Sequence, residues 1–248
     1  MSLKKIKNRI LHPLGYGLIQ AGYSLLQVRG NYSISKPIDP SNIEILGDPA
    51  FKASVKEVSD LTLLDTGRLA NLWQLCRLTD PRGGILEIGS YRGGGALHLS
   101  NACPQRKIYV CDSFRGFEKL DPDLDKSFDL GMFVSTTKRN VEQLFESRKR
   151  NHEVIDGFFP ASCASRSIGP VSFVHLDVDV YKATLESLAY LEKENILTGR
   201  PLIVLDDFHR TAEGVDQAVA EFTAANKKWI SFPLFPGQGL LVHSSWFG

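Results

Sequence analysis

From residue 84 onward, short apolar runs alternate with amphipathic stretches, and this alternation predicts the architecture. Five of the runs read as strands, at 85–89, 107–112, 153–156, 171–177 and 202–207. The apolar residues of these runs are mostly contiguous and do not alternate with polar ones, which is typical of parallel strands that are buried on both faces. Strands that alternate with helical patterns favour a parallel sheet covered by helices.

Three stretches have the apolar spacing of helices. Residues 184–195 and 213–227 place apolar side chains three and four positions apart, as an amphipathic helix requires. Ahead of the sheet, residues 59–78 predict another helix. Its apolar side chains available for packing are Leu64, Leu69, Leu72, Trp73 and Leu75.

The pattern changes near the end of the chain. Apolar runs at 229–235 and 240–245 are separated only by the turn PGQG, which is too short for a crossover helix. These two strands should therefore pair antiparallel. We expect an α/β fold with a mostly parallel seven-stranded sheet, a C-terminal antiparallel hairpin and helices on both faces.

The length of 248 residues fits one large domain with an N-terminal appendage, since nothing in the middle reads as a linker. We assign residues 1–58 to an arm or lid and residues 59–248 to the main domain. The basic, apolar start is interrupted by Pro13 and three glycines and lacks a clear cleavage site, so a secretory signal or a membrane span is not favoured. We expect the arm to pack on the main domain or to join subunits in a homo-oligomer; the alternative is a membrane-surface helix.

Composition narrows the choice of partners. Hydrophobic residues make up 43% and charged residues 23% of the chain, as in an ordinary globular protein. A formal net charge of +1 provides no field that would attract nucleic acid, so a nucleic-acid partner is not favoured. The four cysteines show no CxxC pairing, which favours neither a zinc site nor a disulfide framework and fits a reducing, cytoplasmic location.

A glycine-rich turn follows the first strand of the sheet, in ILEIGSYRGGGALHLS. Glycines permit a sharp turn, and the helix behind them offers free N–H groups to a ligand. The turn lacks both GxGxxG and GK[ST], so neither a dinucleotide nor ATP is indicated. Asp112 ends the next strand and is placed to hold ribose hydroxyls; the alternative is a turn cap with Ser113. Together these features indicate a nucleoside-bearing cofactor without a pyrophosphate.

Carboxylates end the fourth and fifth predicted strands. Asp177 ends the fourth, and Asp206 with Asp207 ends the fifth, so all three should face one crevice. Oxygen ligands suit Mg²⁺, Ca²⁺ or Mn²⁺ better than zinc, although Asp206 and Asp207 could instead cap the next helix. Asp179 is placed to act as a general base beside the metal ligands, and His209 is the other candidate for base or substrate contact.

These motifs together resemble a known family. LEIGSYRGGGALHLS, VCDSFRGF, VIDGFF, HLDVDVYKATLESL and IVLDDFHRTAEGVDQAV are similar to segments of the macrocin O-methyltransferase family, over about residues 60–245. The resemblance implies a Rossmann-like class I methyltransferase that uses S-adenosylmethionine. Family members often have DGDxY where this chain has DVDVY, and PGG where it has TGRP.

The resemblance also implies a role for each site residue. The residues implied to line the methionine part of the cofactor are Glu87, Gly89, Ser90, Tyr91 and Gly93. Those implied to hold its ribose are Asp112 and Ser113, and those implied to lie near its adenine are Asp156, Gly157 and Phe158. The implied ligands of Mg²⁺ or Mn²⁺ are Asp177, Asp206 and Asp207, with Asp179 as the base and Tyr181 over the site. The resemblance to the family is weakest over residues 1–58 and 115–139, and these segments would shape the acceptor pocket.

We therefore expect a Mg²⁺-dependent O-methyltransferase that acts on a hydroxyl of a small molecule, most naturally a sugar or a glycosylated natural product. A phenol or catechol acceptor is the alternative within the same fold. The DVD motif is also typical of metal-dependent glycosyltransferases, but that reading explains neither the glycine turn nor Asp112. A non-catalytic scaffold is a further alternative, and the intact acidic positions argue against it.

Overall fold

A computed structural model describes residues 44–164, 166, 168–209 and 212–247, and the backbone of 24–28 and 31–35. The chain forms two compact units, Met1–Pro49 and Ala50–Gly248. In the first unit, β1 (Ser24–Val28) pairs antiparallel with β2 (Asn31–Ser35), and α2 spans Glu44–Gly47. The predicted arm, 1–58, lies mostly outside the described residues, so its role as a lid or a subunit contact stays a prediction.

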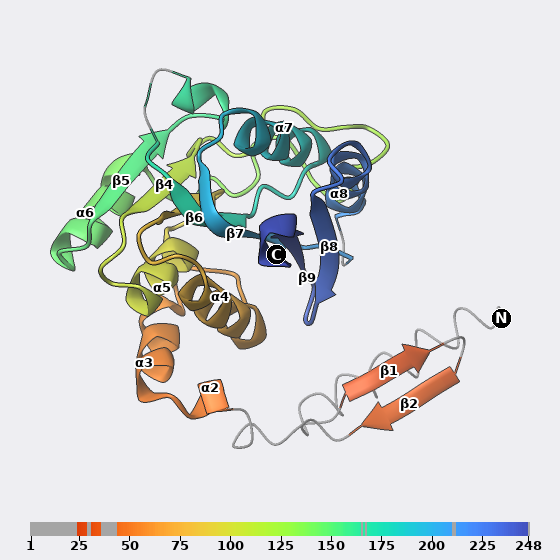
Figure 1. Cartoon of the computed structure of the whole chain (residues 1–248), viewed down its shortest axis with the longest axis horizontal. Helices are drawn as coiled ribbons and strands as arrows, with labels where there is room; N and C mark the ends of the chain where they lie inside the picture. Colours follow the sequence, from red (N-terminus) through yellow and green to blue (C-terminus); the bar gives the residue numbers. More distant parts are fainter. Residues whose placement is uncertain are drawn as a thin grey trace. The chain divides into compact units, whose positions relative to one another are not determined.

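The second unit is built on one sheet of seven strands (Figure 1). The order across the sheet is β5-β4-β3-β6-β7-β9-β8; the first five strands are parallel, and β9 runs antiparallel to both β7 and β8. The strands are β3 (Gly84–Ile88), β4 (Ile108–Asp112), β5 (His152–Asp156), β6 (Val171–Leu176), β7 (Leu197–Asp206), β8 (Trp229–Leu234) and β9 (Gln238–His243). This arrangement confirms the predicted fold, including the antiparallel ending.

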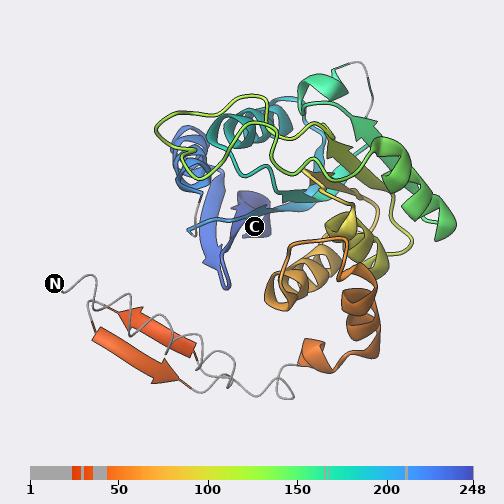
Figure 2. The ribbon, with the colours of Figure 1, turned by 180° about the vertical axis from the view of Figure 1, so that it is seen from behind.

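Helices cover both faces of the sheet, with α4 and α5 on one side and α7 and α8 on the other (Figures 1 and 2). The helices of this unit are α3 (Pro49–Val58), α4 (Thr66–Leu78), α5 (Gly94–Ala102), α6 (Lys138–Ser147), α7 (Tyr181–Lys193) and α8 (Glu213–Ala225). Short 3₁₀ turns, η2 and η3, lie at Ala161–Cys163 and Ser244–Trp246. No helix within the described part of the chain is long and apolar enough to cross a membrane.

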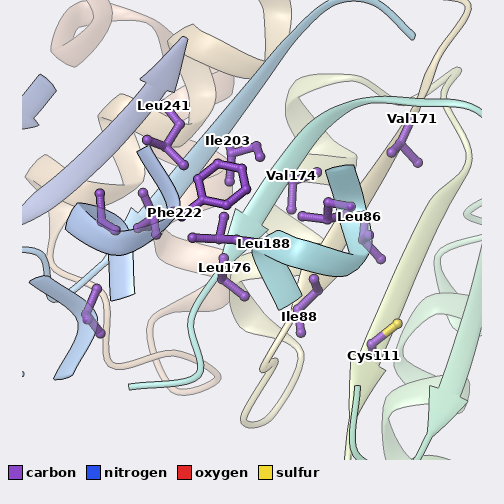
Figure 3. Packing of buried hydrophobic residues seen from close by; sticks show 14 of the residues in the cluster. Leu86, Ile88, Cys111, Val171, Val174, Leu176, Leu188, Ile203, Phe222 and Leu241 are labelled. Atoms are coloured by element: carbon purple, nitrogen blue, oxygen red, sulfur yellow. The ribbon is translucent and has the colours of Figure 1, made fainter. Parts of the chain in front are cut away.

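Successive strand residues point to opposite faces, and this alternation divides the core. Leu86 and Ile88 of β3 belong to a buried cluster with Leu188 of α7 and Phe222 of α8 (Figure 3). On the other face, the rings of Phe51, Trp73 and His98 pack against one another, with centroids 5.2 to 5.7 Å apart. Burial on both faces explains why apolar residues occupy successive positions in these parallel strands.

Two element boundaries differ from the prediction by five residues or more. Helix α4 begins at Thr66, seven residues later than expected, because the side chain of Asp65 accepts a hydrogen bond from Arg68 N (3.0 Å) and caps the helix there. Residues 59–61 form a turn and residues 62–65 are irregular, and Leu61 O accepts from Gly94 N (3.1 Å). Strand β7 begins at Leu197, five residues earlier than expected. Both differences leave the strand ends, where the site lies, as predicted.

Candidate active site

A cavity of about 600 Å³ opens at the carboxyl ends of the parallel strands. The chain winds from β3 towards β5 in one direction across the sheet and from β6 to β7 in the other. Because β3 and β6 are neighbours, the cavity lies where the winding reverses, and ligands of open α/β sheets bind at such a point. The glycine turn and both acidic strand ends face it.

The glycine turn owes its shape to two close contacts. Gly89 has a φ of +81°, and a Cβ at this position would collide with the carbonyl oxygen of Asp177. A Cβ at Gly95 would collide with the carboxylate of Glu87. The turn between β3 and α5 therefore lies directly against the end of β6, with Ser90 and Tyr91 lining the cavity.

Asp112 holds this turn in place. Its Oδ2 accepts hydrogen bonds from Ser90 N (2.7 Å) and Tyr91 N (3.0 Å), and its Oδ1 accepts from Phe114 N (2.7 Å). Ser90 Oγ adds a weaker contact to Oδ2 at 3.3 Å. Since a carboxylate oxygen has two lone pairs, Oδ1 keeps one for a further donor from the cavity. Ser113 also lines the cavity, but its Oγ accepts from Arg115 N (3.1 Å) and donates to Gly116 O (3.2 Å) within its own turn.

Glu87 and His175 form a buried pair directly opposite each other on β3 and β6. Nδ1 of His175 donates to Oε1 of Glu87 (2.9 Å), and Glu87 is only 1% exposed. Burial raises the pKa of Glu87, while the bond from His175 acts in the opposite direction. Among the residues that the structure describes, Glu87 Oε2 has no hydrogen-bond partner although it is buried. The wall of the cavity thus contains an acceptor without a donor.

Four carboxylates line the cavity beyond the glycine turn, those of Asp177, Asp179, Asp206 and Asp207. Burial raises the pKa of Asp177 well above its ordinary value, and the charges of the other three raise it further. Asp179 has a pKa raised by burial and by Asp207, to which its side chain is hydrogen-bonded. Two carboxylates form such a bond only when one of them holds a proton.

Arg68 of α4 lies among these carboxylates, and the sequence analysis did not identify it. Its Nη1 donates to Asp206 Oδ2 and lies 3.7 Å from Asp207 Oδ1. The side chain lines the cavity, and the residue is 7% exposed. A signal was present, because Arg68 stands four residues before Leu72, on the apolar face of the predicted helix.

The chemistry of these side chains suits a divalent cation. Carboxylate oxygens are the ligands that Mg²⁺ and Mn²⁺ prefer, and four carboxylates with one guanidinium leave an excess of buried negative charge. In the described part of the chain, no three His, Cys, Asp or Glu side chains are arranged as a ready metal site. One reason is that Asp206 is occupied: besides Arg68, its Oδ1 accepts from Gln238 Nε2 at 3.0 Å.

Twelve of the predicted site residues line this one cavity: Glu87, Gly89, Ser90, Tyr91, Asp112, Ser113, Gly157, Phe158, Asp177, Asp179, Asp206 and Asp207. Gly93, Asp156 and His209 do not. Gly93 is the N-cap residue before α5, with a φ of +83°, and it faces Val141 of α6. Asp156 pairs with Arg115 outside the cavity, Nη1 to Oδ1 being 3.4 Å.

His209 and Tyr181 both turn towards α8. Nδ1 of His209 lies 3.1 Å from Asp216 Oδ2, and the side chain is 58% exposed. The hydroxyl of Tyr181 donates to Glu221 Oε2 at 2.8 Å. The expectation that Tyr181 lies over the site is therefore wrong, because its ring belongs to the contact between α7 and α8.

Known proteins share this sequence pattern and fold. Residues 59–235, more than half of the chain, match the family described as macrocin-O-methyltransferase (TylF). The mycinamicin III 3''-O-methyltransferase of Micromonospora griseorubida is 23% identical over 202 residues, which cover 68% of this chain and 77% of that protein.

Two solved structures illustrate the fold. The O-methyltransferase NovP superposes with a TM-score of 0.63 at 18% identity, covering 74% of this chain and 82% of NovP. The methyltransferase PaMTH1 of Podospora anserina, solved with SAH bound, has a TM-score of 0.53 at 13% identity, covering 84% and 97% of the two chains. At these identities the likeness concerns the fold alone, while the match over residues 59–235 concerns the family. The chain belongs to the macrocin O-methyltransferase family and is an S-adenosylmethionine-dependent O-methyltransferase.

Proposed function

We propose that this enzyme methylates a hydroxyl of a sugar in a glycosylated small molecule, with the help of Mg²⁺ or Mn²⁺. The acceptor class is supported by the family and by the relative named for O-methylation of mycinamicin III. The observation that carries the mechanism is the meeting of the glycine turn and four carboxylates in one cavity.

The cofactor end of the cavity is formed by the glycine turn and the ends of β4 and β5. When bound, S-adenosylmethionine supplies a sulfonium methyl group whose S–C bond breaks as the acceptor oxygen bonds to the carbon. Glu87 Oε2, which lacks a donor among the described residues, would accept from the ammonium group of the methionine part. Asp112 Oδ1 has a lone pair left for a ribose hydroxyl, and Phe158 lines the cavity where the adenine would lie.

The acceptor end contains the carboxylates. Asp177, Asp206 and Asp207 would hold the cation, and a cation bound there lowers the pKa of a hydroxyl beside it. Asp179 takes the hydroxyl proton as the acceptor oxygen attacks. It is the better placed of the two predicted bases, because it lines the cavity while His209 pairs with Asp216 at the surface.

Aromatic side chains support a second candidate acceptor, a phenol or catechol. Phe117, Phe133 and Tyr91 line the cavity, with ring centroids 5.5 Å apart for Phe117 and Phe133 and 6.3 Å apart for Tyr91 and Phe133. Such a wall would pack equally well on an aromatic acceptor or on the apolar part of a glycoside.

Methyl transfer from labelled S-adenosylmethionine to a panel of glycosides, their aglycones and simple catechols tests these proposals. We expect turnover on glycosides that chelator abolishes and Mg²⁺ or Mn²⁺ restores. Asp177→Asn should lose activity, whereas Asp60→Asn, a matched change at an exposed carboxylate, should keep it. Turnover that survives chelator would overturn the metal requirement, and turnover restricted to catechols would replace the sugar acceptor.

A further inference from the structure

Arg68 is held from three directions. Nε donates to Asp65 Oδ2 (3.2 Å), Nη2 donates to Leu63 O (2.9 Å), and Nη1 donates to Asp206 Oδ2. The first two partners precede the helix that carries Arg68, and the third ends β7. The guanidinium is thus held between the start of α4 and the end of β7. It stays in the cavity, because withdrawing it would leave the buried carboxylate of Asp206 without its cation.

The contacts of Arg68 involve the oxygens that a cation would use. Oδ2 of Asp206 points a lone pair at Nη1, and Oδ1 of Asp207 is 3.7 Å from the same nitrogen. The remaining oxygen of Asp206 accepts from Gln238. A divalent cation bound by Asp206 would therefore share it with Arg68, and two positive centres a few ångströms apart repel each other.

We propose that Arg68 is a resident counter-cation of this cluster, which competes with the divalent cation for Asp206 and so weakens its binding. The inference rests on the proposed metal site and adds the residue that sets its affinity. A guanidinium keeps its charge at every working pH, so the competition is a permanent property of the cavity.

Titration of the full-length, cofactor-free protein with Mn²⁺, followed by calorimetry, tests this role. Arg68→Gln removes the charge and keeps part of the side chain's bulk and polarity. Arg68→Lys keeps the charge. Arg106→Gln is the matched control, because Arg106 is a buried arginine that donates to carbonyl and hydroxyl oxygens: Gly83 O, Cys76 O, Gly84 O, Thr79 Oγ1 and Ser172 Oγ.

We expect Arg68→Gln to bind Mn²⁺ about tenfold more tightly than the wild type or better, since removal of a nearby positive charge favours a cation. Arg68→Lys should bind like the wild type. Arg106→Gln should also bind like the wild type, even though its Tm falls. Binding by Arg68→Gln that is equal to or weaker than that of the wild type would overturn the proposal, because Arg68 would then be neutral to the cation or support it.

Two further outcomes are also decisive. Should Arg68→Gln fail to fold in chelator, recovery of its folded state by Mn²⁺ supports the competition, and failure at saturating Mn²⁺ overturns it. If neither the wild type nor Arg68→Gln binds Mn²⁺, both the proposed competition and the proposed metal site are wrong. Glycoside methylation in chelator would then show whether the acceptor half of the proposed function survives.

Discussion

The surroundings of Asp179 determine its chemistry. Burial and the neighbouring Asp207 raise its pKa well above the ordinary value, and Arg68 moderates the increase. A carboxylate with a raised pKa binds a proton more strongly and is a better general base for a hydroxyl.

Asp179→Asn should therefore lower kcat by about 10²- to 10⁴-fold, the usual contribution of general-base catalysis. Its affinity for S-adenosylhomocysteine should stay near that of the wild type, because the proposed role of Asp179 is towards the acceptor and not the cofactor. His209→Ala should retain turnover, since His209 lies outside the cavity. Steady-state kinetics measures kcat and calorimetry measures the affinity for S-adenosylhomocysteine. A larger loss of kcat in His209→Ala than in Asp179→Asn would make His209 the general base.

Asp112 and Ser113 are neighbours, but we expect them to contribute differently to cofactor binding. Asp112→Ala removes the acceptor of Ser90 N and Tyr91 N as well as the free lone pair of Oδ1, so S-adenosylhomocysteine should bind about tenfold to a hundredfold more weakly. Ser113→Ala should have a much smaller effect, because its hydroxyl is engaged in its own turn. Equal losses in the two variants would contradict this assignment.

Local sequence patterns identified the residues at strand ends but not their long-range partners. Asp177 and Asp206 could be placed together because the ends of adjacent parallel strands meet at one edge. Arg68 contacts Asp206 across 138 positions of sequence, and no local spacing predicts such a contact. His209 binds Asp216, which is only seven positions away, and the sequence pattern did not distinguish this attachment from a place in the cavity.

Helix α7, which follows the DVDVY turn, is capped by a residue from a distant segment. Its own cap position, Val180, has no side-chain hydrogen bond to offer. Instead, the buried Asp125 accepts from Tyr181 N (2.9 Å) through Oδ1 and from Asp121 N (2.8 Å) through Oδ2. The segment between β4 and α6 is thereby joined to the turn that carries Asp179.

Asp125→Ala should reduce the free energy of unfolding by about 1 to 2 kcal/mol through loss of this cap. Turnover should fall as well, because the Asp179 turn loses its support. Asp123→Ala, at an exposed position two residues away, is the control and should change neither quantity. Chemical denaturation measures the free energy of unfolding, and steady-state kinetics measures turnover. Normal turnover in Asp125→Ala would show that the cap does not support catalysis.

His98 of α5 joins three helices. Its Nε2 donates to Leu69 O (3.0 Å) of α4, so Nδ1 accepts from Ser54 Oγ (2.8 Å) of α3. Burial lowers the pKa of His98 from 6.5 to about 4. Between these two values the unfolded chain binds a proton that the folded chain does not, so stability is complete above pH 6.5 and falls as the pH decreases towards 4.

The loss over this range should amount to about 3 kcal/mol. In His98→Gln, the free energy of unfolding should depend less steeply on pH across the same window. Denaturation at a series of pH values measures the difference, and His209→Gln, at an exposed histidine, is the control. Parallel curves for the wild type and His98→Gln would contradict the assigned pKa.

At the scale of elements, apolar periodicity was sufficient to find the strands and helices and insufficient to find where some of them begin. Residues 59–65 share the apolar pattern of α4, yet the carboxylate of Asp65 starts the helix later and leaves Thr62 to Leu64 to line the cavity. The capping residue and the apolar periodicity indicate different starting points for α4, and both signals are present in the same stretch of sequence.

In the whole molecule, the sheet and the cavity belong to the unit Ala50–Gly248. A chain that begins at residue 44 should therefore still bind S-adenosylhomocysteine with unchanged affinity. Calorimetry on the shortened chain tests this, and loss of binding would show that residues 1–43 take part in the cofactor site. Retained binding with lost glycoside turnover would instead assign them to the acceptor.

The overall fold class followed from the order of apolar runs, because strands alternating with helices form parallel sheets and a four-residue turn forces a hairpin. The sequence did not specify on which side of β3 each later strand lies. That choice places β6 beside β3 and brings Glu87 opposite His175. Pairing between strands far apart in sequence is decided by the whole core, which no short pattern contains.

The bond from Gln238 to Asp206 also bears on how the enzyme is made. Gln238 is fully buried on β9, and it donates to Asp206 while accepting from Asn71 of α4 (3.0 Å). Domains fold as units during synthesis, so a nascent chain extended only to residue 230 would have made both carboxylate strands without the hairpin that steadies them. On the ribosome, Asp206 would therefore lack this donor until one of the last strands was translated.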